Sequence, residues 1–330
     1  MSSQIVKTFI LKIIPLFFYL LGLISISISL FGYGGKFNLY LEAITNFKPQ
    51  LLLLSVICLP YFYLRKQYIW LGLISIVLFV NASLVIPWYV NFSTIDTTNT
   101  AKYNHLKILS FNVLTTNKQY QETIDFTLQE NPDIAVFLEA KSPSWNQGLQ
   151  SLENHYQYHV SYPKLQIEIY SQIALTNPQV DVYGGYRGVI TNQIYFEEQE
   201  QPITFIATHA YPQIYYGSEG FKIRNNHLLQ GIGKHVSGVK TPVIVIGDLN
   251  ATMWSPFYQE MIKLSGLKNT RQGWGILPTQ SSFNPNIKLL STPIDHCLIS
   301  PKIVVEKMKT ASNFGSDHLP IVVDLAIPKA

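Results

Sequence analysis

Two short polar strings near the C-terminus hold residues whose types and spacing could do chemistry. Gly-Asp-Leu-Asn at 247–250 follows the apolar run 242–246, and Ser-Asp-His at 316–318 precedes the apolar run 319–323. A carboxylate at a strand end can activate water, and an amide and an imidazole can hold an oxyanion. These strings therefore predict a hydrolytic site.

The same placement of polar residues recurs elsewhere in the chain. Asn112, Glu139 and His209 each end an apolar, strand-like run, as Asp248 does. Ligand sites of layered α/β proteins gather at strand ends, so convergence of these ends would form one polar cleft.

Each of these residues also has an ordinary structural interpretation. Asn112 alone is more often a turn residue, Glu139 could face solvent, and His209 alone is more often structural. The Asp248 string could be a simple Asx turn, and Asp317 with His318 could be a helix cap beside a surface imidazole. The functional hypothesis therefore depends on the ordered set.

The residues from 105 onward predict an α/β sandwich with mixed sheets. Strand-like runs outnumber helical patterns, and helices fall between some strands but not all, which disfavours a simple parallel barrel. Strands are expected at 106–112, 133–138, 170–175, 189–196, 202–208, 242–247, 294–299, 302–308 and 320–326, and helices at 118–130, 144–153, 221–236 and 256–264.

The first ninety residues are strongly apolar. Runs at 8–34, 50–64 (extendable back to Ile44) and 68–90 approach or exceed the roughly 20 residues that span a bilayer. The first run is too long for a signal peptide and lacks a clear Ala-x-Ala site. We expect an anchor of three transmembrane helices at 1–92, a Thr- and Asn-rich linker at 93–104, and a catalytic domain at 105–330.

Charge predicts how the anchor is oriented. Lys7 and Lys12 lie at the N-terminal end of the first span, and Arg65-Lys66 lies between the second and third runs, so both places should be cytoplasmic. The loop at 35–48 also contains two lysines, which makes the bias mild. This orientation places the domain after the third run outside the cytoplasm.

Net charge argues against a grip on long nucleic acid. The first 100 residues contain six basic and two acidic side chains, whereas the remainder contains 18 of each. A neutral domain is poor support for extensive phosphate contacts. The two cysteines, Cys58 and Cys297, make no disulfide framework, and no Cys/His cluster has zinc spacing.

In combination, the polar strings resemble the endonuclease/exonuclease/phosphatase superfamily, which includes DNase I, AP endonucleases and neutral sphingomyelinases. The resemblance runs from about residue 106 to 326. It implies a DNase I-like, four-layer α/β sandwich. Three transmembrane helices before such a domain resemble a bacterial membrane-anchored branch of the superfamily. The matching stretches are Ser110-Phe111-Asn112, Phe137-Leu138-Glu139-Ala140, Thr208-His209, Gly247-Asp248-Leu249-Asn250, Ile294-Asp295-His296 and Gly315-Ser316-Asp317-His318.

The resemblance implies a metal and a reacting water. Glu139 would be the main ligand of Mg²⁺, or of Mn²⁺ in its place, with Asn112 close by and Asp317 contributing. Oxygen ligands suit Mg²⁺, which retains waters and binds substrate phosphate. Asp248 would orient or deprotonate the attacking water.

The resemblance also implies how phosphate is held. Asn250 and His209 would hydrogen-bond phosphate oxygens. His318 would stabilise the pentavalent transition state, and Asp295 would orient His318 and keep it cationic. Arg187 could reach phosphate or form a salt bridge.

Two further residues stay open at this stage. Arg224 could likewise reach phosphate or form a salt bridge, and His296, directly after Asp295, has no assigned role. The Trp-Cys-Asp-Arg stretch expected of inositol-phosphate phosphatases is absent, and residues 292–296 read Thr-Pro-Ile-Asp-His instead.

The sequence thus predicts a membrane-anchored, Mg²⁺-dependent phosphoesterase, nuclease-like first, acting on phosphodiesters or phosphomonoesters. Its substrate would be nucleic acid or, alternatively, a phospholipid of the sphingomyelin type, and no protein partner is predicted. The expected location is a bacterial inner membrane. Rival hypotheses are a non-catalytic scaffold, disfavoured because all eight superfamily residues are present, and a transport protein, disfavoured because the runs contain no acidic residue.

Overall fold

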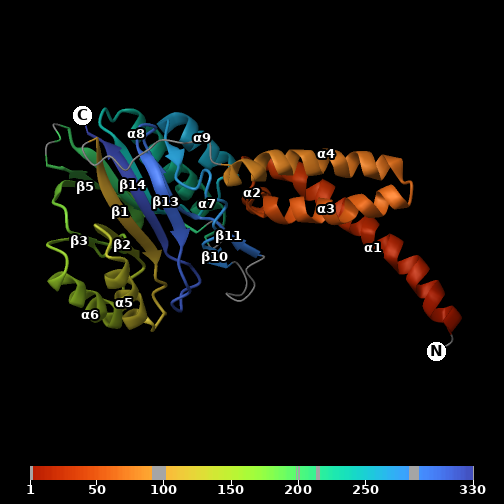
Figure 1. Cartoon of the computed structure of the whole chain (residues 1–330), viewed down its shortest axis with the longest axis horizontal. Coiled ribbons are helices and arrows are strands. Elements are labelled where there is room, and N and C mark those ends of the chain that lie inside the picture. The colour runs from red at the N-terminus through yellow and green to blue at the C-terminus, as the bar shows by residue number, and fades with distance from the viewer. Residues whose placement is uncertain are drawn as a thin grey trace. The chain divides into compact units, whose positions relative to one another are not determined.

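The chain separates into two compact units, Met1–Pro87 and Trp88–Ala330, and each is described by itself. The computed structural model describes residues 3–90, 102–197, 199, 201–212, 216–281 and 290–329. The linker expected at 93–104 lies outside the described residues as far as residue 101. Figure 1 shows the helical unit in red and orange and the α/β unit in yellow to blue.

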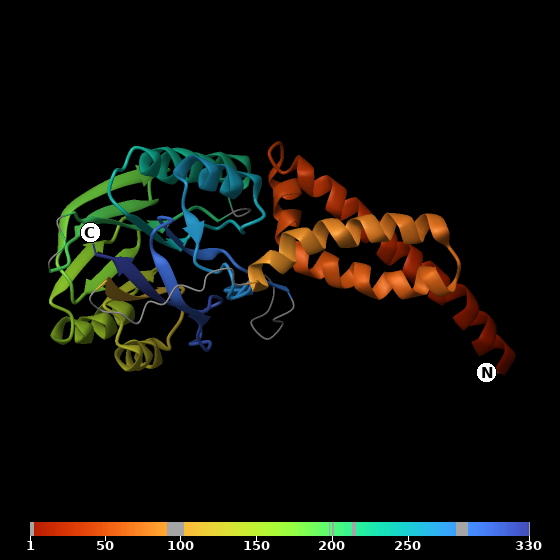
Figure 2. The ribbon, with the colours of Figure 1, turned by 45° about the horizontal axis from the view of Figure 1, so that its top comes forward.

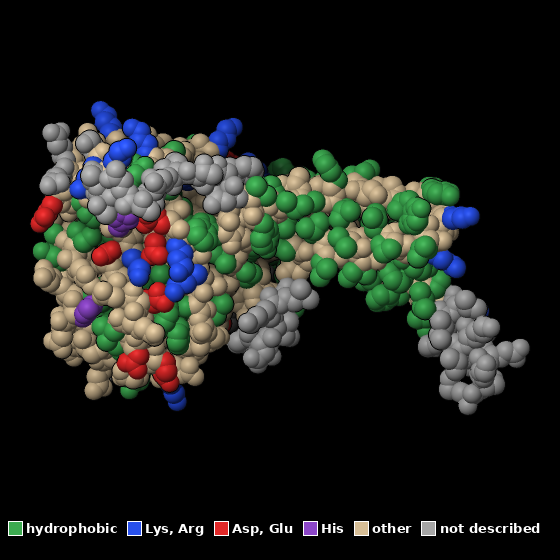
Figure 3. All heavy atoms as spheres, viewed as in Figure 1, with side chains coloured by type: hydrophobic (Ala, Val, Ile, Leu, Met, Phe, Trp, Pro, Cys, Tyr) green, Lys and Arg blue, Asp and Glu red, His purple; other side chains and the backbone are tan. Residues whose placement is uncertain are grey.

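The first unit consists of helices with predominantly apolar surfaces, as the green side chains of Figure 3 show. Three stretches are long and apolar enough to cross a membrane, namely Lys12–Gly34, Leu39–Leu64 and Tyr68–Tyr89. The expectation of three such helices is confirmed. The α-helices of the first unit are α1 (Ser3–Phe31), α2 (Leu39–Ala43), α3 (Lys48–Leu64) and α4 (Tyr68–Val85).

Polar side chains join the helices of this unit in its interior. The buried hydroxyls of Ser25 and Ser55 lie 3.0 Å apart, and the Asn81 amide donates to Ser29 Oγ at 3.0 Å. Hydrogen bonds of this kind hold apolar helices together where lipid offers no hydrophobic driving force.

Two six-stranded sheets form the second unit. The first has the order β13-β14-β1-β2-β4-β3 and the second the order β5-β6-β7-β8-β12-β9. The first sheet contains β1 (Tyr103–Asn112), β2 (Ile134–Leu138), β3 (Tyr158–Tyr162), β4 (Ile167–Ser171), β13 (Val304–Thr310) and β14 (Ile321–Pro328). The second contains β5 (Leu175–Tyr183), β6 (Arg187–Ile194), β7 (Ile203–His209), β8 (Val243–Asp248), β9 (Lys268–Asn269) and β12 (Asp295–Ile299).

Both sheets are mixed, as the sequence predicts. β1 pairs in parallel with β2, and β7 in parallel with β8, while the other pairings are antiparallel. A short hairpin of β10 (Gln280–Ser281) and β11 (Ser291–Thr292) lies apart from the two sheets. Parallel pairing brings the carboxyl ends of β1 and β2 to one edge, and those of β7 and β8 to one edge.

The sheets face each other across one apolar core. Ile108 and Val136 of the first sheet belong to the same buried cluster as Phe205 and Ile246 of the second. Residues of alternate parity, such as Phe111 and Phe137, point the other way into a second cluster with Trp145. Alternate side chains of β1 and β2 therefore pack into two different apolar layers, one between the sheets and one beneath the helices.

Helices cover both outer faces and complete four layers (Figure 2). The first sheet is covered by α5 (Tyr120–Glu130) and α6 (Pro143–Gln150). The second is covered by α7 (Gly217–Asn226), a π-helical segment (His227–Lys234), α8 (His235–Ser237) and α9 (Pro256–Ser265). The predicted four-layer sandwich is confirmed.

Two strand predictions were wrong in detail. The single strand expected at 170–175 is instead the end of β4 and the start of β5, which belong to different sheets, and β3 was not predicted. β3 and β5 are edge strands whose residues are mostly exposed or half-buried. Edge strands lack the regular apolar alternation on which sequence prediction depends.

The core between the sheets should dominate the stability of the second unit. Phe205→Ala removes a fully buried ring and should lower the free energy of unfolding by about 3–5 kcal/mol. Tyr195→Ala, at a side chain that is 46% exposed, is the matched control and should change stability by less than about 0.5 kcal/mol. Urea-dependent pulse proteolysis of the full chain measures both, and equal losses would contradict the assigned core.

Candidate active site

Three adjacent strands of the second sheet place polar side chains in one row. His209 ends β7 and pairs with Asp248 at the end of β8, which pairs with Asp295 at the start of β12. All three are at least 98% buried. Strand register therefore brings together residues that are far apart in sequence.

The first sheet supplies a second pair at the same place. Asn112 ends β1, and Glu139 follows β2 in the left-handed region at φ +63°. The Asn112 amide nitrogen lies 3.2 Å from Asp248 Oδ2 and 3.4 Å from Glu139 Oε1. Asn112 thus links carboxylates from the two sheets, and its Oδ1 accepts from the Leu114 amide at 3.2 Å.

Glu139 lies beside an arginine and a histidine. Arg187 Nη2 is 3.2 Å and His209 Nε2 is 3.5 Å from Glu139 Oε1. Burial alone would raise the pKa of Glu139, but His209, Arg187 and His318 outweigh it and lower the pKa to about 2. Glu139 is therefore ionised at neutral pH and remains 20% exposed at its side chain.

His209 is neutral and has unused hydrogen-bonding capacity. Burial, together with the charge of Arg187, lowers the pKa of His209 to about 4. Arg187 is consequently the standing positive charge beside Glu139. Within the described residues, neither ring nitrogen of His209 nor Arg187 Nε has a hydrogen-bond partner. Buried polar atoms of this kind call for a ligand or water.

Asp248 has the properties of a general base. Burial and the nearby charge of Asp295 raise its pKa to about 7, despite hydrogen bonds from Asn250 and Asn112. A carboxylate whose pKa lies near neutrality can accept a proton from water.

His318 and Asp295 form a buried ion pair. His318 Nδ1 lies 2.8 Å from Asp295 Oδ2, and His318 Nε2 lies 3.9 Å from Asp248 Oδ2. Burial alone would lower the pKa of His318, but Asp295, Asp248 and Asp317 raise it to about 10. The His318 charge also outweighs burial at Asp295 and lowers the pKa of that carboxyl. The imidazolium is therefore cationic at neutral pH.

Asp248, Asp295 and His318 have ligand atoms within 4.8 Å of one another, a spacing that could also hold a metal ion. Two observations favour an acid–base cluster instead. Nδ1 of His318 is already hydrogen-bonded to Asp295, and a protonated imidazole has no lone pair to give to a metal. The His318 imidazolium already supplies the positive charge that balances Asp248 and Asp295, so these two carboxylates need no metal ion.

The structure brings together eight of the nine predicted site residues, and Asn250 is the eighth. Asn250 lies at φ +48°, and its side-chain amide donates to Ala210 O at 3.0 Å and Asp248 Oδ2 at 3.2 Å. Asp317 is half-buried, and its charge acts on His318. Arg187 makes the predicted salt bridge, with Glu139 as its partner.

Two supporting residues escaped sequence analysis. Gln166 Oε1 accepts from Arg187 Nη1 at 3.0 Å, and Ser316 Oγ donates to the Asn112 carbonyl at 2.7 Å. Gln166 lies in a turn with no distinguishing motif. Ser316 belongs to the Ser-Asp-His string, so that string contained the signal.

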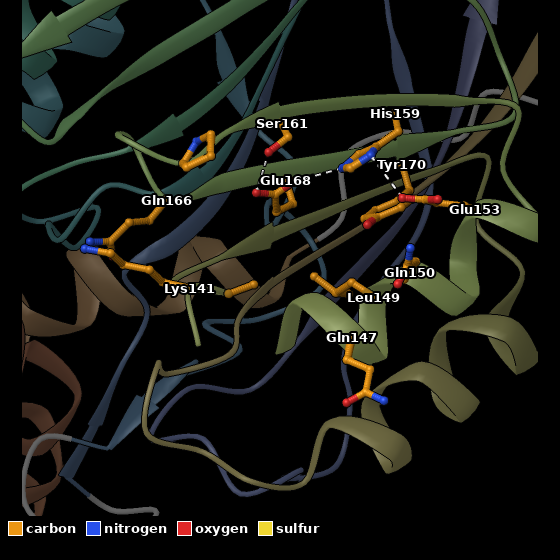
Figure 4. A pocket seen from close by; sticks show the side chains of 12 residues that line it. Lys141, Gln147, Leu149, Gln150, Glu153, His159, Ser161, Gln166, Glu168 and Tyr170 are labelled. Carbon is orange, nitrogen blue, oxygen red and sulfur yellow. Dashed lines mark hydrogen bonds and ion pairs between the residues drawn. The ribbon is translucent and has the colours of Figure 1, made fainter. Parts of the chain in front are cut away.

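A cavity of about 460 Å³ is lined by Gln166, the partner of Arg187, and by Ala140, which directly follows Glu139 (Figure 4). His159 stacks on Tyr170 with ring centroids 4.2 Å apart and bonds to Glu168 at 2.9 Å. The cavity has a mixed polar and apolar lining that includes both basic and acidic side chains. It is lined by Ala140, Lys141, Gln147, Leu149, Gln150, Glu153, His159, Ser161, Pro163, Gln166, Glu168 and Tyr170.

Comparison with known proteins decides the family. The family model of the Endonuclease/Exonuclease/phosphatase family matches residues 109–318, which include every site residue above. The chain belongs to this family. A search of curated proteins finds no match.

Solved structures of the endonuclease/exonuclease/phosphatase family and related enzymes share the fold. A family protein from Bacteroides thetaiotaomicron is 15% identical, with a TM-score of 0.56, and the match covers 68% of this chain and 99% of that one. D. rerio TDP2 with a single-strand DNA product is 15% identical, with a TM-score of 0.55 and coverages of 67% and 99%. Sphingomyelinase C from Streptomyces griseocarneus is 14% identical, with a TM-score of 0.50 and coverages of 67% and 99%.

The His318–Asp295 pair predicts a loss of stability at alkaline pH. The folded pKa of His318, about 10, lies above its ordinary value of 6.5. The stabilisation is therefore fully present below pH 6.5 and is lost as pH rises toward 10. Asp295→Asn should flatten the fall in unfolding free energy between pH 7 and 10, measured by urea denaturation of the full chain. Parallel curves for the two proteins would contradict the pairing.

Proposed function

We propose that the chain is a membrane-anchored, metal-dependent phosphoesterase that hydrolyses a phosphodiester by in-line attack of water. The observation that carries the proposal is the single buried cluster in which Asp248, with a pKa raised to about 7, lies 3.9 Å from the cationic His318. A base and a cation side by side are what attack on an anionic phosphate requires.

Glu139 fits the role of principal metal ligand. It is an ionised carboxylate, and it is partly exposed. Carboxylate oxygens with retained waters are the usual Mg²⁺ environment, and Mn²⁺ would find the same ligands. Asn112 turns its amide nitrogen toward Glu139, so we assign Asn112 to orienting the Glu139 and Asp248 carboxylates rather than to binding the metal. Asp317 is a further candidate metal ligand. A bound cation would neutralise phosphate charge.

The remaining residues act on the phosphate and the water. Asp248 takes a proton from the attacking water, while the single N–H of the neutral His209 ring binds a phosphate oxygen. The Asn250 side-chain amide, which we expected to bind phosphate, already donates to Ala210 O and Asp248 Oδ2, so we assign it to orienting Asp248. His318, oriented by Asp295, stabilises the negative charge that develops on the oxygens of the pentavalent transition state. Arg187 can reach a phosphate oxygen through its Nε, which has no hydrogen-bond partner among the described residues.

The substrate is a phosphate ester of nucleic acid or phospholipid type. A nuclease-like activity agrees with the fold, which TDP2 with its DNA product shares. A phospholipid diester is favoured by the three apolar helices, which would hold the protein at a lipid surface. In Figure 3 acidic and basic side chains are interspersed over the visible face of the α/β unit, without a basic track.

Removing the metal or the site residues should abolish hydrolysis. Mg²⁺-dependent cleavage of bis-p-nitrophenyl phosphate by the detergent-solubilised full chain should stop in EDTA and fall about 10²–10⁴-fold in Asp248→Asn and His318→Gln. Glu139→Gln should also weaken Mg²⁺ binding in isothermal titration calorimetry. Asp181→Asn, on the edge strand β5, is the matched control for charge removal and should retain activity.

Failure would take a definite form. Full activity of Glu139→Gln at low Mg²⁺ would overturn the metal assignment. Folded protein that neither binds Mg²⁺ nor turns over plasmid DNA, RNA, sphingomyelin or the model diester would favour the scaffold hypothesis.

We further propose that the helical unit lies in a cell membrane, with the α/β unit outside the cytoplasm. Arg65 and Lys66 occupy the α3–α4 turn, flanked by the exposed aromatic residues Tyr63 and Tyr68. Basic turns face the cytoplasm, and tyrosines favour the membrane interface.

Protease added to intact spheroplasts of a bacterial expression host tests this orientation. The α/β unit should be degraded while a cytoplasmic marker protein survives. An α/β unit that becomes sensitive only after lysis would reverse the orientation.

A further inference from the structure

Two fully buried side chains, Arg224 and His296, hydrogen-bond to the loop that contains Asp248 and Asn250. Arg224 Nη1 donates to the carbonyl of Asn250 at 2.9 Å, and His296 Nε2 donates to the carbonyl of Ala251 at 2.8 Å. Their exposures are 0% and 1%. Two successive carbonyls of one loop are therefore held from separate elements, α7 and β12.

The loop adopts a conformation that needs such support. Asn250 has φ +48°, a left-handed conformation that most residues avoid. Its backbone N–H donates to Asp248 Oδ1 at 2.7 Å. Uncommon backbone conformations persist only when the surrounding structure determines them. Fixing the carbonyls of residues 250 and 251 fixes the two peptide planes that flank Ala251, the first of which directly follows Asn250.

Neighbouring residues determine which nitrogen of His296 carries the proton. Nδ1 faces the Asn269 side-chain amide at 2.9 Å and Arg271 Nη1 at 3.3 Å, and both are donors. The orientation of the Asn269 amide is itself fixed, since its Oδ1 accepts from the Arg271 backbone. Nδ1 must therefore accept, and Nε2 carries the hydrogen donated to Ala251.

Arg271 and burial also keep His296 uncharged. Burial, with the charge of Arg271, lowers the pKa of His296 to about 3. A neutral ring with one donor and one acceptor satisfies both sides of the contact over the physiological pH range.

Strand alternation explains why His296 follows Asp295 directly. Successive side chains of β12 point to opposite faces of the sheet. Asp295 faces His318, whereas His296 packs against Tyr258 of α9 on the other face, with ring centroids 5.0 Å apart. One strand thus orients the His318 cation on one face and holds the Asp248 loop from the other.

We propose that His296 and Arg224 are positioning residues that lock the 248–251 loop and so hold Asp248, with the Asn250 side chain that orients it, at the reacting phosphate. This inference rests on the proposed function. Small misplacement of reacting groups can cost about 10²-fold in rate, so loosening the loop should lower kcat by up to that factor with little change in KM.

Chemical rescue of His296→Gly in the full chain tests the contact. Added imidazole, which can donate and accept, should restore about tenfold of the lost kcat, the worth of one hydrogen bond. 1-Methylimidazole has no N–H and should restore nothing. Met261→Ala, which removes a fully buried apolar side chain from α9, controls for lost packing and should keep the wild-type kcat. Equal rescue by both imidazoles, or an unchanged kcat in His296→Gly, would overturn the proposal.

Amide hydrogen exchange gives a readout that does not depend on activity. Exchange at Leu249 and Asn250 should accelerate in His296→Gly and slow again with imidazole, but not with 1-methylimidazole. Arg224→Lys should accelerate the same amides and serves if His296→Gly fails to fold. Unchanged exchange in both variants would overturn the proposal. A wild-type protein without hydrolysis, but with the expected exchange changes, would contradict the proposed function and leave the positioning contacts supported.

Discussion

Two buried carboxylates, Asp248 and Asp295, are cross-strand partners on β8 and β12, and this juxtaposition governs the site. Like charges placed together away from water repel, which raises the pKa of one of them. The His318 imidazolium compensates by bonding to Asp295 and approaching Asp248. The remaining carboxylate is left as a base near neutrality, so one electrostatic constraint creates both the base and the cation.

The fold meets this constraint through the ends of parallel strands. His209 and Asp248 are the last residues of the parallel strands β7 and β8. Asn112 is the last residue of β1, and Glu139 directly follows the last residue of its parallel neighbour β2. The sheets share an apolar core, and the polar strand ends converge at one edge of it. His296, on the opposite face of β12 from Asp295, hydrogen-bonds to the loop that contains Asp248.

Sequence predicted the parts of the structure that local pattern determines. Apolar runs ending in Asn112, Glu139, His209 and Asp248 fixed the central strands and identified the cluster, because burial on both faces leaves a continuous apolar signal. The edge strands lacked that signal. Some contacts join a side chain to the backbone of a distant segment, and a backbone carbonyl leaves no trace in the sequence. Arg224 was expected to contact phosphate or to form a salt bridge, whereas in the structure it donates to the carbonyl of Asn250.

Hydrolysis of bis-p-nitrophenyl phosphate by the full chain in ¹⁸O-labelled water tests the central claim most directly. Attack of water at phosphorus predicts Mg²⁺-dependent turnover with the label in p-nitrophenyl phosphate and none in p-nitrophenol. Label in p-nitrophenol, or no turnover by folded protein with Mg²⁺ bound, would contradict the account.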